Sequence, residues 1–233
     1  MNYQSVAARE AQVAAAFPAL MRKVYVWMTL ALAITGFTAY YVATNETIIT
    51  LIFGNRAVFW GLIIAEFAIV IGVTAAINKL SLPVATLLFV FYSLINGVVL
   101  SSIFFIYTTG SIATTFFITA GTFGAMSLFG YFTKTDLTSW GKILVMALIG
   151  LIIATIVNIF LKSSGLEMIV SYLGVLVFVG LTAYDTQKIK QMCLQAPDAG
   201  ETMQKFALMG ALSLYLDFIN LFIYLLRIFG RRN

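Results

Sequence analysis

The chain contains no histidine, one cysteine and three prolines among its 233 residues. Without histidine it lacks the side chain that most often titrates near neutral pH, and also the commonest ligand of transition metals. The single cysteine, Cys193, cannot form a disulfide within the chain, so the sequence does not indicate a redox compartment. Any response to pH near neutrality must therefore come from carboxyl groups.

Charged residues are also scarce, at 10% of the chain, whereas hydrophobic residues make up 61%. A soluble domain usually carries roughly 25% charged residues, so this chain cannot cover a compact body in water. Its apolar residues stand in long uninterrupted runs, for which a lipid bilayer is the fitting solvent. The net charge of +5 does not indicate a nucleic-acid partner, because the basic residues stand singly beside apolar runs, as membrane-edge anchors do.

Seven apolar segments are each about long enough to cross a ~30 Å hydrocarbon core as a helix. They do not alternate apolar and polar residues, as the strands of a membrane barrel would. Residues 1–22 lack the pattern of a cleaved signal peptide. We therefore predict an all-α membrane protein with an N-terminal tail, residues 1–22, and a single seven-helix transmembrane domain, residues 23–233. The expected spans are Val24–Ala43, Val58–Ile77, Val84–Tyr107, Ile112–Phe132, Ile143–Leu161, Met168–Tyr184 and Phe206–Ile228.

Small residues recur within two of these spans, in a spacing that is typical of closely packed membrane helices. The longest polar connector covers residues 185–205, between the last two spans, and is too short to form a soluble domain. The small residues are Ser93, Gly97 and Ser101 in the third span, and Gly121, Gly124 and Gly130 in the fourth.

The distribution of lysine and arginine favours a cytoplasmic N-terminus, because cytoplasmic loops carry an excess of these residues. With that orientation, nine basic residues lie inside and five outside. Three of the outside residues follow the middle of the last span, so either that span re-enters and returns, or the upstream helices decide the orientation. The inside residues are Arg9, Arg22, Lys23, Lys79, Lys134, Lys142, Lys188, Lys190 and Lys205; the outside ones are Arg56, Lys162, Arg227, Arg231 and Arg232.

Three carboxylates stand within or at the end of apolar segments. Asp217 lies near the middle of the last span, Asp185 closes the expected sixth span, and Glu66 lies midway through the second. An ionisable side chain at the centre of a bilayer costs roughly 2.5–3.5 kcal/mol on insertion scales and marks a pathway or a site. For each acid a purely structural role is the alternative, and Asp185 can simply mark a helix end.

Asp217 carries the strongest signal of the three. At 100° per residue, Ser213, Asp217, Asn220 and Tyr224 fall on one helical face. Such a polar stripe inside an apolar helix must face the bundle interior or water, so Ser213 and Asn220 are supporting polar candidates.

Two neighbouring carboxyl groups can share a proton, which provides a pH switch without histidine. When both are ionised, Asp185 and Asp217 offer hard oxygen ligands that suit a transiently bound calcium ion better than zinc or copper. The sequence alone does not place Asp185 beside Asp217, because a loop and half a helix separate them.

No enzyme signature is present, since the chain has no catalytic triad, phosphate loop or dinucleotide fingerprint. An aspartyl intramembrane protease is the one catalytic alternative, because Tyr184-Asp185 resembles half of its motif. Asp217, however, lies in Leu-Asp-Phe without the glycine-rich context of the second acid. We expect neither catalysis nor a resident cofactor.

Two segments around the acids resemble the signature segments of the Bax inhibitor-1 family, also called the transmembrane Bax inhibitor motif family. They are Gly180–Ile189, with Asp185, and Ala211–Phe222, with Asp217. The segment Tyr92–Phe104 resembles the third helix of that family. The resemblance spans nearly the whole chain, and the short loops resemble those of bacterial members.

The resemblance implies a seven-helix bundle with the last helix at its centre. Members act as calcium-permeable leak channels with a pair of aspartates as pH sensor, and Asp185 and Asp217 would be that pair. Glu66 matches an acidic position in the second helix of bacterial members. Some members have an arginine at the inner end of that helix that pairs with the aspartates, and Lys79 is the nearby basic residue here.

The leading interpretation is a pH-sensitive, calcium-permeable leak channel of the bacterial plasma (inner) membrane. Its expected partners are the bilayer, calcium ions and protons. The second is a regulator without transport that binds another membrane protein, such as a quality-control protease. The third is a proton-coupled transporter of a small solute, which saturable uptake would distinguish.

Overall fold

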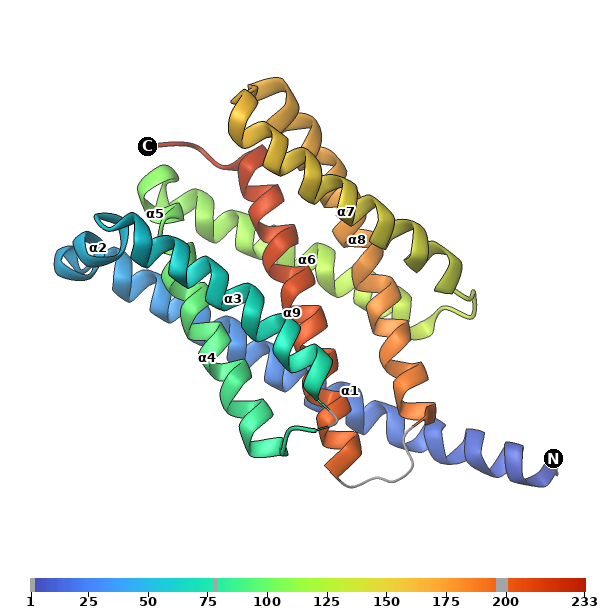
Figure 1. Ribbon diagram of the computed structural model, residues 1–233. Coiled ribbons are helices and arrows are strands. Elements are labelled where there is room, and N and C mark those ends of the chain that lie inside the picture. Colours follow the sequence, from blue (N-terminus) through green and yellow to red (C-terminus); the bar gives the residue numbers. More distant parts are fainter. Residues whose placement is uncertain (1–2, 78, 196–200) are drawn as a thin grey trace. The chain divides into compact units, whose positions relative to one another are not determined.

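The computed structural model describes residues 3–77, 79–195 and 201–233, and these residues form helices joined by short connections (Figure 1). Among them the only strand-like pairing is an isolated bridge between Tyr107 and Arg232. The helices are α1 Tyr3–Ala43, α2 Glu46–Phe53, α3 Arg56–Ala76, α4 Leu82–Leu100, α5 Ile103–Ile106, α6 Thr109–Phe132, α7 Thr138–Leu161, α8 Ser164–Gln195 and α9 Glu201–Phe229.

Seven helical segments are long and apolar enough to cross a membrane, which confirms the expected fold class. The last one is the most buried: 67% of an 18-residue window of α9 is buried, compared with 6% for α3 and for α7. A helix so enclosed agrees with the expected central position of the last span. The seven segments are Phe17–Ala43, Arg56–Ala76, Leu82–Ile106, Thr109–Phe132, Thr138–Leu161, Ser164–Met192 and Glu201–Phe229.

Two expectations about the connectors are wrong. Asp185 does not close the sixth span, because α8 continues for about three more turns to Gln195. Most of the expected connector 185–205 is therefore helix, and its residues 196–200 lie outside the described part. The first connector also contains a helix of its own, α2. Hydropathy reports where lipid contact ends and not where helical hydrogen bonding ends, so it misses the end of α8. The helix α2 is apolar but, with 8 residues, too short to be predicted as a span.

Polar side chains fix several helix starts. The first backbone N–H groups of a helix have no partner within it, and a preceding Asn or Thr can accept from them. The Asn45 Oδ1 accepts from the Ile48 N–H at 3.1 Å, and the Asn55 Oδ1 accepts from the Ala57 N–H at 3.0 Å. The Thr108 Oγ1 accepts from the Ser111 N–H at 3.3 Å. These caps begin α2, α3 and α6.

By their contacts the residues fall into two compact units. Unit 1 comprises Met1–Ile106 and Met192–Leu212, and unit 2 comprises Tyr107–Gln191 and Ser213–Asn233. The helix α9 contributes its first part to unit 1 and its remainder to unit 2. Each unit is described below by itself.

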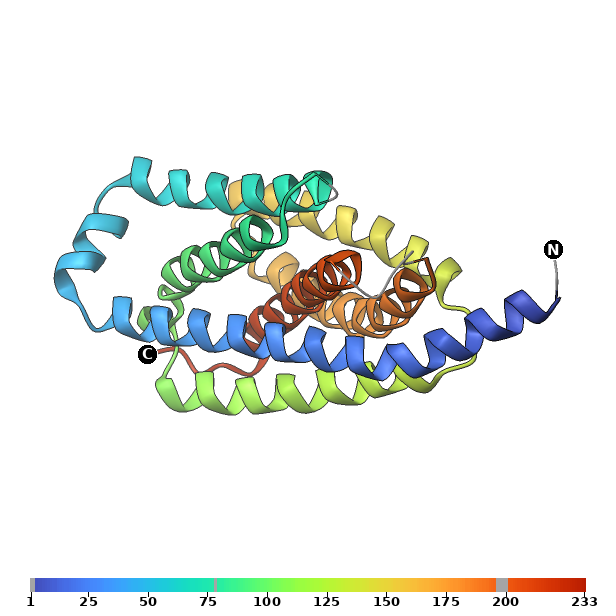
Figure 2. The ribbon, with the colours of Figure 1, turned by 90° about the horizontal axis from the view of Figure 1, so that it is seen from below.

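In unit 1, α4 lies between α1 and α3 (Figure 2). The backbone of Gly97 approaches α1 so closely that an added Cβ would lie 2.7 Å from the Thr35 carbonyl oxygen. The Thr35 Oγ1 donates a hydrogen bond to the Ser93 carbonyl at 2.9 Å. Ser93 and Gly97 of the third span therefore lie in a close contact between helices, as their spacing predicts. The same prediction is wrong for Gly121 and Gly124 of the fourth span, which have no atom within 4 Å of an added Cβ.

In unit 2, α8 contacts α6, α7 and the second part of α9. At Gly130 of α6, an added Cβ would overlap the backbone of Ala183 on α8. At Gly141 of α7, it would overlap the ring of Tyr184. The ring of Phe218 on α9 lies 5.5 Å from that of Phe123 on α6. Close backbone approach and aromatic packing thus hold these four helices together.

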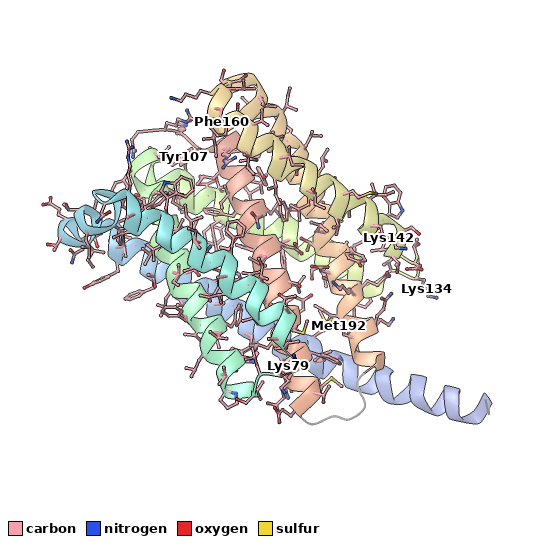
Figure 3. All side chains as sticks on the ribbon, in the orientation of Figure 1. Lys79, Tyr107, Lys134, Lys142, Phe160 and Met192 are labelled. Carbon is pink, nitrogen blue, oxygen red and sulfur yellow. The ribbon has the colours of Figure 1, made fainter. Side chains whose placement is uncertain are left out.

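The last span crosses once, because α9 is a single helix from Glu201 to Phe229 without a re-entrant turn. After it, the Thr108 N–H donates to the Arg231 carbonyl at 3.0 Å, and the Arg231 N–H donates to the Ser111 Oγ at 2.9 Å. Within unit 2, Tyr107 and Phe160 lie at one end, and Lys134 and Lys142 lie at the other (Figure 3). The alternative in which the last span re-enters the membrane and returns is therefore wrong, because α9 is one continuous helix.

Candidate functional site

Asp217 lies near the middle of α9, and its side chain is buried, with 4% of its surface exposed. Its Oδ2 atom is buried and has no hydrogen-bond partner. Its neighbours in the chain, Leu216 and Phe218, are apolar, and the Phe218 ring packs between those of Phe116 and Phe123 on α6. A buried polar atom without a partner costs free energy, so its retention in a core position calls for a functional explanation.

Asp185 lies on α8 within the same unit, half-buried, and its carboxylate interacts electrostatically with that of Asp217. The exposed ammonium group of Lys188, one turn further along α8, interacts with both acids. The Lys188 Nζ lies 5.9 Å from the centroid of the Tyr184 ring. The structure thus brings together the two acids that the sequence could not place beside each other.

The polar stripe along α9 is less uniform than its periodicity indicates. Ser213 and Asn220 are half-buried. The Asn220 Nδ2 donates to the Leu216 carbonyl of its own helix at 2.8 Å. The Tyr224 ring stacks on Phe178 of α8, with centroids 5.9 Å apart. Of the four residues on this face, only Asp217 is fully buried.

Glu66 belongs to unit 1, where it forms a separate polar contact. The Nδ2 of Asn96 on α4 donates to the Glu66 Oε1 at 2.8 Å, and Asn96 is buried. Glu66 itself is half-buried. Lys79 follows α3 and is exposed. The third candidate acid therefore has an amide partner on a neighbouring helix, unlike the buried Oδ2 of Asp217.

The α8 turn that carries Asp185 is also held by contacts that sequence reasoning missed. The Leu137 N–H donates to the Gln187 Oε1 at 2.8 Å, and the Gln187 Nε2 donates to the Thr135 carbonyl at 2.8 Å. The hydroxyl groups of Ser127 on α6 and Thr186 on α8 are hydrogen-bonded at 3.0 Å. Polar residues in a helical pattern were the only sequence signal, because both loop partners of Gln187 are backbone atoms.

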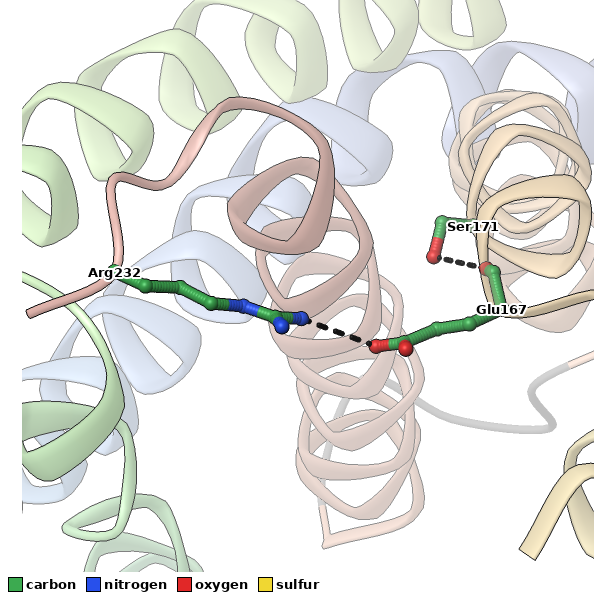
Figure 4. Close-up of polar contacts among 3 residues, drawn as sticks. All are labelled: Glu167, Ser171 and Arg232. Atoms are coloured by element: carbon green, nitrogen blue, oxygen red, sulfur yellow. Dashed lines mark hydrogen bonds and ion pairs between the residues drawn. The ribbon is translucent and has the colours of Figure 1, made fainter. Parts of the chain in front are cut away.

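The opposite end of unit 2 is closed by charged and backbone contacts. The Arg232 Nη2 lies 3.6 Å from the Glu167 Oε1, and the Ser171 Oγ donates to the Glu167 carbonyl (Figure 4). The guanidinium carbon of Arg227 lies 5.4 Å from the Tyr224 ring centroid. A cavity of about 360 Å³ lies there, lined by Thr108, Gly110, Ser111, Thr114, Thr115, Phe229 and Arg231. This lining contains no carboxylate that would attract a cation.

The described residues contain no group of three or more Asp, Glu, Cys or His side chains that could hold a metal ion. Calcium usually takes six to eight oxygen ligands. Asp185 and Asp217 supply two carboxylates, so the pair can contribute to a transient cation contact but does not form a complete cage.

Seven long apolar helices define a multi-pass integral membrane protein, and two of them, α8 and α9, carry the acidic pair. The sequence profile of the family described as "Inhibitor of apoptosis-promoting Bax1" matches residues 18–233. The chain belongs to this Bax inhibitor family.

Relatives of similar length support this assignment. The chain is 55% identical over 215 residues to the "Inner membrane protein YbhL" of Escherichia coli (strain K12), covering 91% of this chain and 92% of that protein. It is 50% identical over 213 residues to an uncharacterized protein of Borreliella burgdorferi, covering 91% and 92%. It is 36% identical over 213 residues to an uncharacterized membrane protein of Streptococcus pyogenes serotype M1, with the same coverage.

Proposed function

We propose that the protein is a pH-sensitive, calcium-permeable leak channel, gated by protonation of the Asp185–Asp217 pair. The observation that carries the proposal is the buried, unpartnered Oδ2 of Asp217 on α9, in a unit where Asp185 of α8 is its acidic neighbour. The proposal assigns no catalytic step and no resident cofactor to this pair.

Electrostatic repulsion supplies the switching energy. Two unit charges 4 Å apart repel each other by roughly 4 kcal/mol at an effective dielectric constant of about 20. A proton shared by two carboxyl groups removes this repulsion, and its loss restores it. In this mechanism the second state of the pair differs in the packing of α8 against α9, and the two states differ in their leak of cations.

The chemistry of the pair favours calcium as the permeant ion. Carboxylate oxygens are hard ligands, which suit calcium, and a site with few protein ligands releases the ion readily. Lys188 lies close enough to attract both acids, so it competes with an arriving cation. The proposed role of the acids is thus a brief contact along a path and not storage.

We also propose that the protein lies in the bacterial inner membrane with its N-terminus in the cytoplasm. The relative YbhL is described as an inner membrane protein. In unit 2, Lys134 and Lys142 lie at one end (Figure 3). Over the whole chain, the side assigned to these two residues carries nine basic residues against five, which favours it as the cytoplasmic side. Single cysteines introduced at Lys134 and at Lys162 should react with an impermeant maleimide in opposite sets of membrane vesicles.

Calcium flux measured in a defined bilayer tests the channel. Purified protein in liposomes loaded with a calcium dye should show a flux that changes with pH across neutrality. Asp217→Asn and Asp185→Asn should remove most of that pH dependence, because a neutral amide can neither lose the proton nor repel its neighbour. The matched control is Glu46→Gln, which removes an exposed carboxylate at the start of α2 in unit 1 and should leave the profile unchanged.

An unchanged profile in both Asp217→Asn and Asp185→Asn would overturn the gating role. A wild-type protein without any calcium flux would favour a regulator that binds another membrane protein. Saturable uptake of a small solute driven by a proton gradient would favour a transporter instead.

A further inference from the structure

Three consecutive residues of α8 interact with three different neighbours in unit 2. Asp185 interacts electrostatically with Asp217 of α9, Thr186 is hydrogen-bonded to Ser127 of α6, and Gln187 is hydrogen-bonded to the α6–α7 loop. At 100° per residue, Asp185 and Gln187 point about 200° apart, to opposite sides of the helix. The loop therefore contacts this turn of α8 on the side opposite to Asp185.

The contact between Gln187 and the α6–α7 loop consists of hydrogen bonds between uncharged groups. The Gln187 amide accepts from the Leu137 N–H and donates to the Thr135 carbonyl, each at 2.8 Å. An amide that uses its oxygen and its nitrogen on two backbone groups of one loop holds that loop in a defined orientation. Because neither partner titrates near neutrality, this contact has the same strength whether the acid pair is protonated or not.

We propose that Gln187 is a positioning residue that sets the pH at which the Asp185–Asp217 pair changes state. The contact between Gln187 and residues 135 and 137 stabilises the arrangement with the two acids adjacent. Charge repulsion after proton loss favours the separated arrangement. The balance between the Gln187 contact and this repulsion determines the pH midpoint of the transition. For its effect on calcium flux, the inference rests on the proposed function.

Few charged groups surround this turn, so substitutions can test the balance between the Gln187 contact and the repulsion of the two acids. The pair itself and Lys188 act on each other directly. The loop adds Lys134 and Asp136, and α7 adds Lys142. The helix α6 carries no charged residue, and Tyr131 is its one titratable side chain. The part of α9 in unit 2 adds Arg227.

The first test replaces Gln187 with methionine, which keeps the length of the side chain and removes both hydrogen bonds. Without these hydrogen bonds the arrangement with adjacent acids is less stable at every pH. A smaller degree of ionisation of the pair is then enough to separate the two acids. The midpoint of the flux profile should move to lower pH by about half a unit or more, with the two plateau fluxes retained. The matched control is Gln191→Met one turn along α8, whose Nε2 lies 3.5 Å from the Thr138 Oγ1 and which should not move the midpoint.

The second test fixes the contact covalently. In a Cys193→Ser background, Thr135→Cys and Gln187→Cys are joined by a bifunctional thiol reagent. Joining should move the midpoint to higher pH, and reduction should reverse the shift. An equal midpoint in wild type, Gln187→Met and the cross-linked protein would overturn the inference, whereas an effect on both plateau fluxes alone would show a merely structural role.

Hydrogen exchange separates this inference from the channel itself. In nanodiscs, the peptide covering residues 183–191 should exchange faster above the midpoint than below it, and Gln187→Met should move that change to lower pH. If this occurs without any calcium flux, the positioning role holds and the channel proposal fails. If flux depends on pH but exchange of this peptide does not, the channel proposal holds and the positioning role fails.

Discussion

The two ends of unit 2 are held together in different ways. At the loop end, defined as residues 133–137 with residues 183–191 of α8, the contacts are neutral hydrogen bonds beside two acids. At the tail end, defined as residues 108–111, Glu167 and residues 231–233, an ion pair and backbone hydrogen bonds join the segments. The loop end therefore adjoins the buried Asp217 Oδ2, which has no hydrogen-bond partner, while the tail end pairs its acid.

This difference indicates where the molecule can respond to protons. An exposed carboxylate that is paired with a cation, such as Glu167, contributes little to the free energy of folding. A buried carboxylate next to a second one has two charge states of very different energy. Under the proposed function, the tail end is a fixed closure, and the loop end is the part that responds to protons.

The contact of α6 with α8, next to the loop end, should be the most sensitive to substitution. Gly130→Ala places a methyl group onto the backbone of Ala183, two residues before Asp185. Overpacking of this kind costs typically 1–3 kcal/mol, because the backbone of α8 cannot yield as a side chain can. Thermal unfolding in detergent should show a clearly lower midpoint, and the pH response of the acid pair should be distorted.

The same substitution elsewhere in α6 is the control. Gly124 has no atom within 4 Å of an added Cβ, so Gly124→Ala should be neutral or stabilise the helix by up to about 1 kcal/mol. If both variants had equal unfolding midpoints, the close contact between α6 and α8 would not exist as described.

Loss of the ion pair at the tail end should have a smaller effect on stability than the change at Gly130. Glu167→Gln removes the pair with Arg232, whose side chains are 41% and 64% exposed, so solvent screens their attraction strongly. Exposed ion pairs contribute 0 to about 1 kcal/mol, and this one should be near the lower bound. We expect a small loss of stability that disappears at high salt, with the pH profile of calcium flux unchanged.

A moved flux midpoint in Glu167→Gln would contradict the division into a switching end and a fixed end. The direct comparison is with Gln187→Met, which also removes one polar side chain from α8. Only the variant at the loop end should move the midpoint.

The seven spans could be predicted from the sequence because each crossing of a bilayer needs about 20 apolar residues in one run. The end of α8 could not, since Thr186, Gln187 and Lys188 look like a loop by hydropathy. Ile189, which is 1% exposed, shows that this polar segment still has a buried face. Hydropathy measures the preference for lipid, and a helical segment with one polar and one buried face does not register there.

The candidate site was predictable only in part. The helical period placed Asp217 on a polar face, and its burial follows from that pattern. The proximity of Asp185 depends on how α8 packs against α9, which no local pattern encodes. The contact of Gln187 was beyond reach because its partners are the backbone atoms of residues 135 and 137, which every sequence has.

The weakest effect on stability is predicted at Asp136, which lies in the loop end and outside the membrane spans. Its Oδ1 accepts hydrogen bonds from the Thr138 Oγ1 at 2.6 Å and from the Thr138 N–H at 2.9 Å, at the start of α7. The side-chain hydrogen bond first, and the backbone one second, hold the pKa of this carboxyl below its usual value of 3.8. Thr138→Val removes the hydroxyl donor and should raise that pKa part of the way back.

The sign of the accompanying stability change follows from the direction of the shift. A carboxyl with a lowered pKa stabilises the folded state above the pKa of the unfolded chain, and this contribution disappears as the pH falls through the folded value. Thr138→Val should therefore reduce only the stability measured above about pH 4, and leave the most acidic range unaltered. Carbon-13 titration of labelled Asp136 checks the pKa, with Thr135→Val as control because only the Thr135 carbonyl takes part in the Gln187 contact. An equal pKa in wild type and Thr138→Val would show that the backbone N–H alone stabilises this carboxylate, and the loop end would then owe its order to Gln187 and not to Asp136.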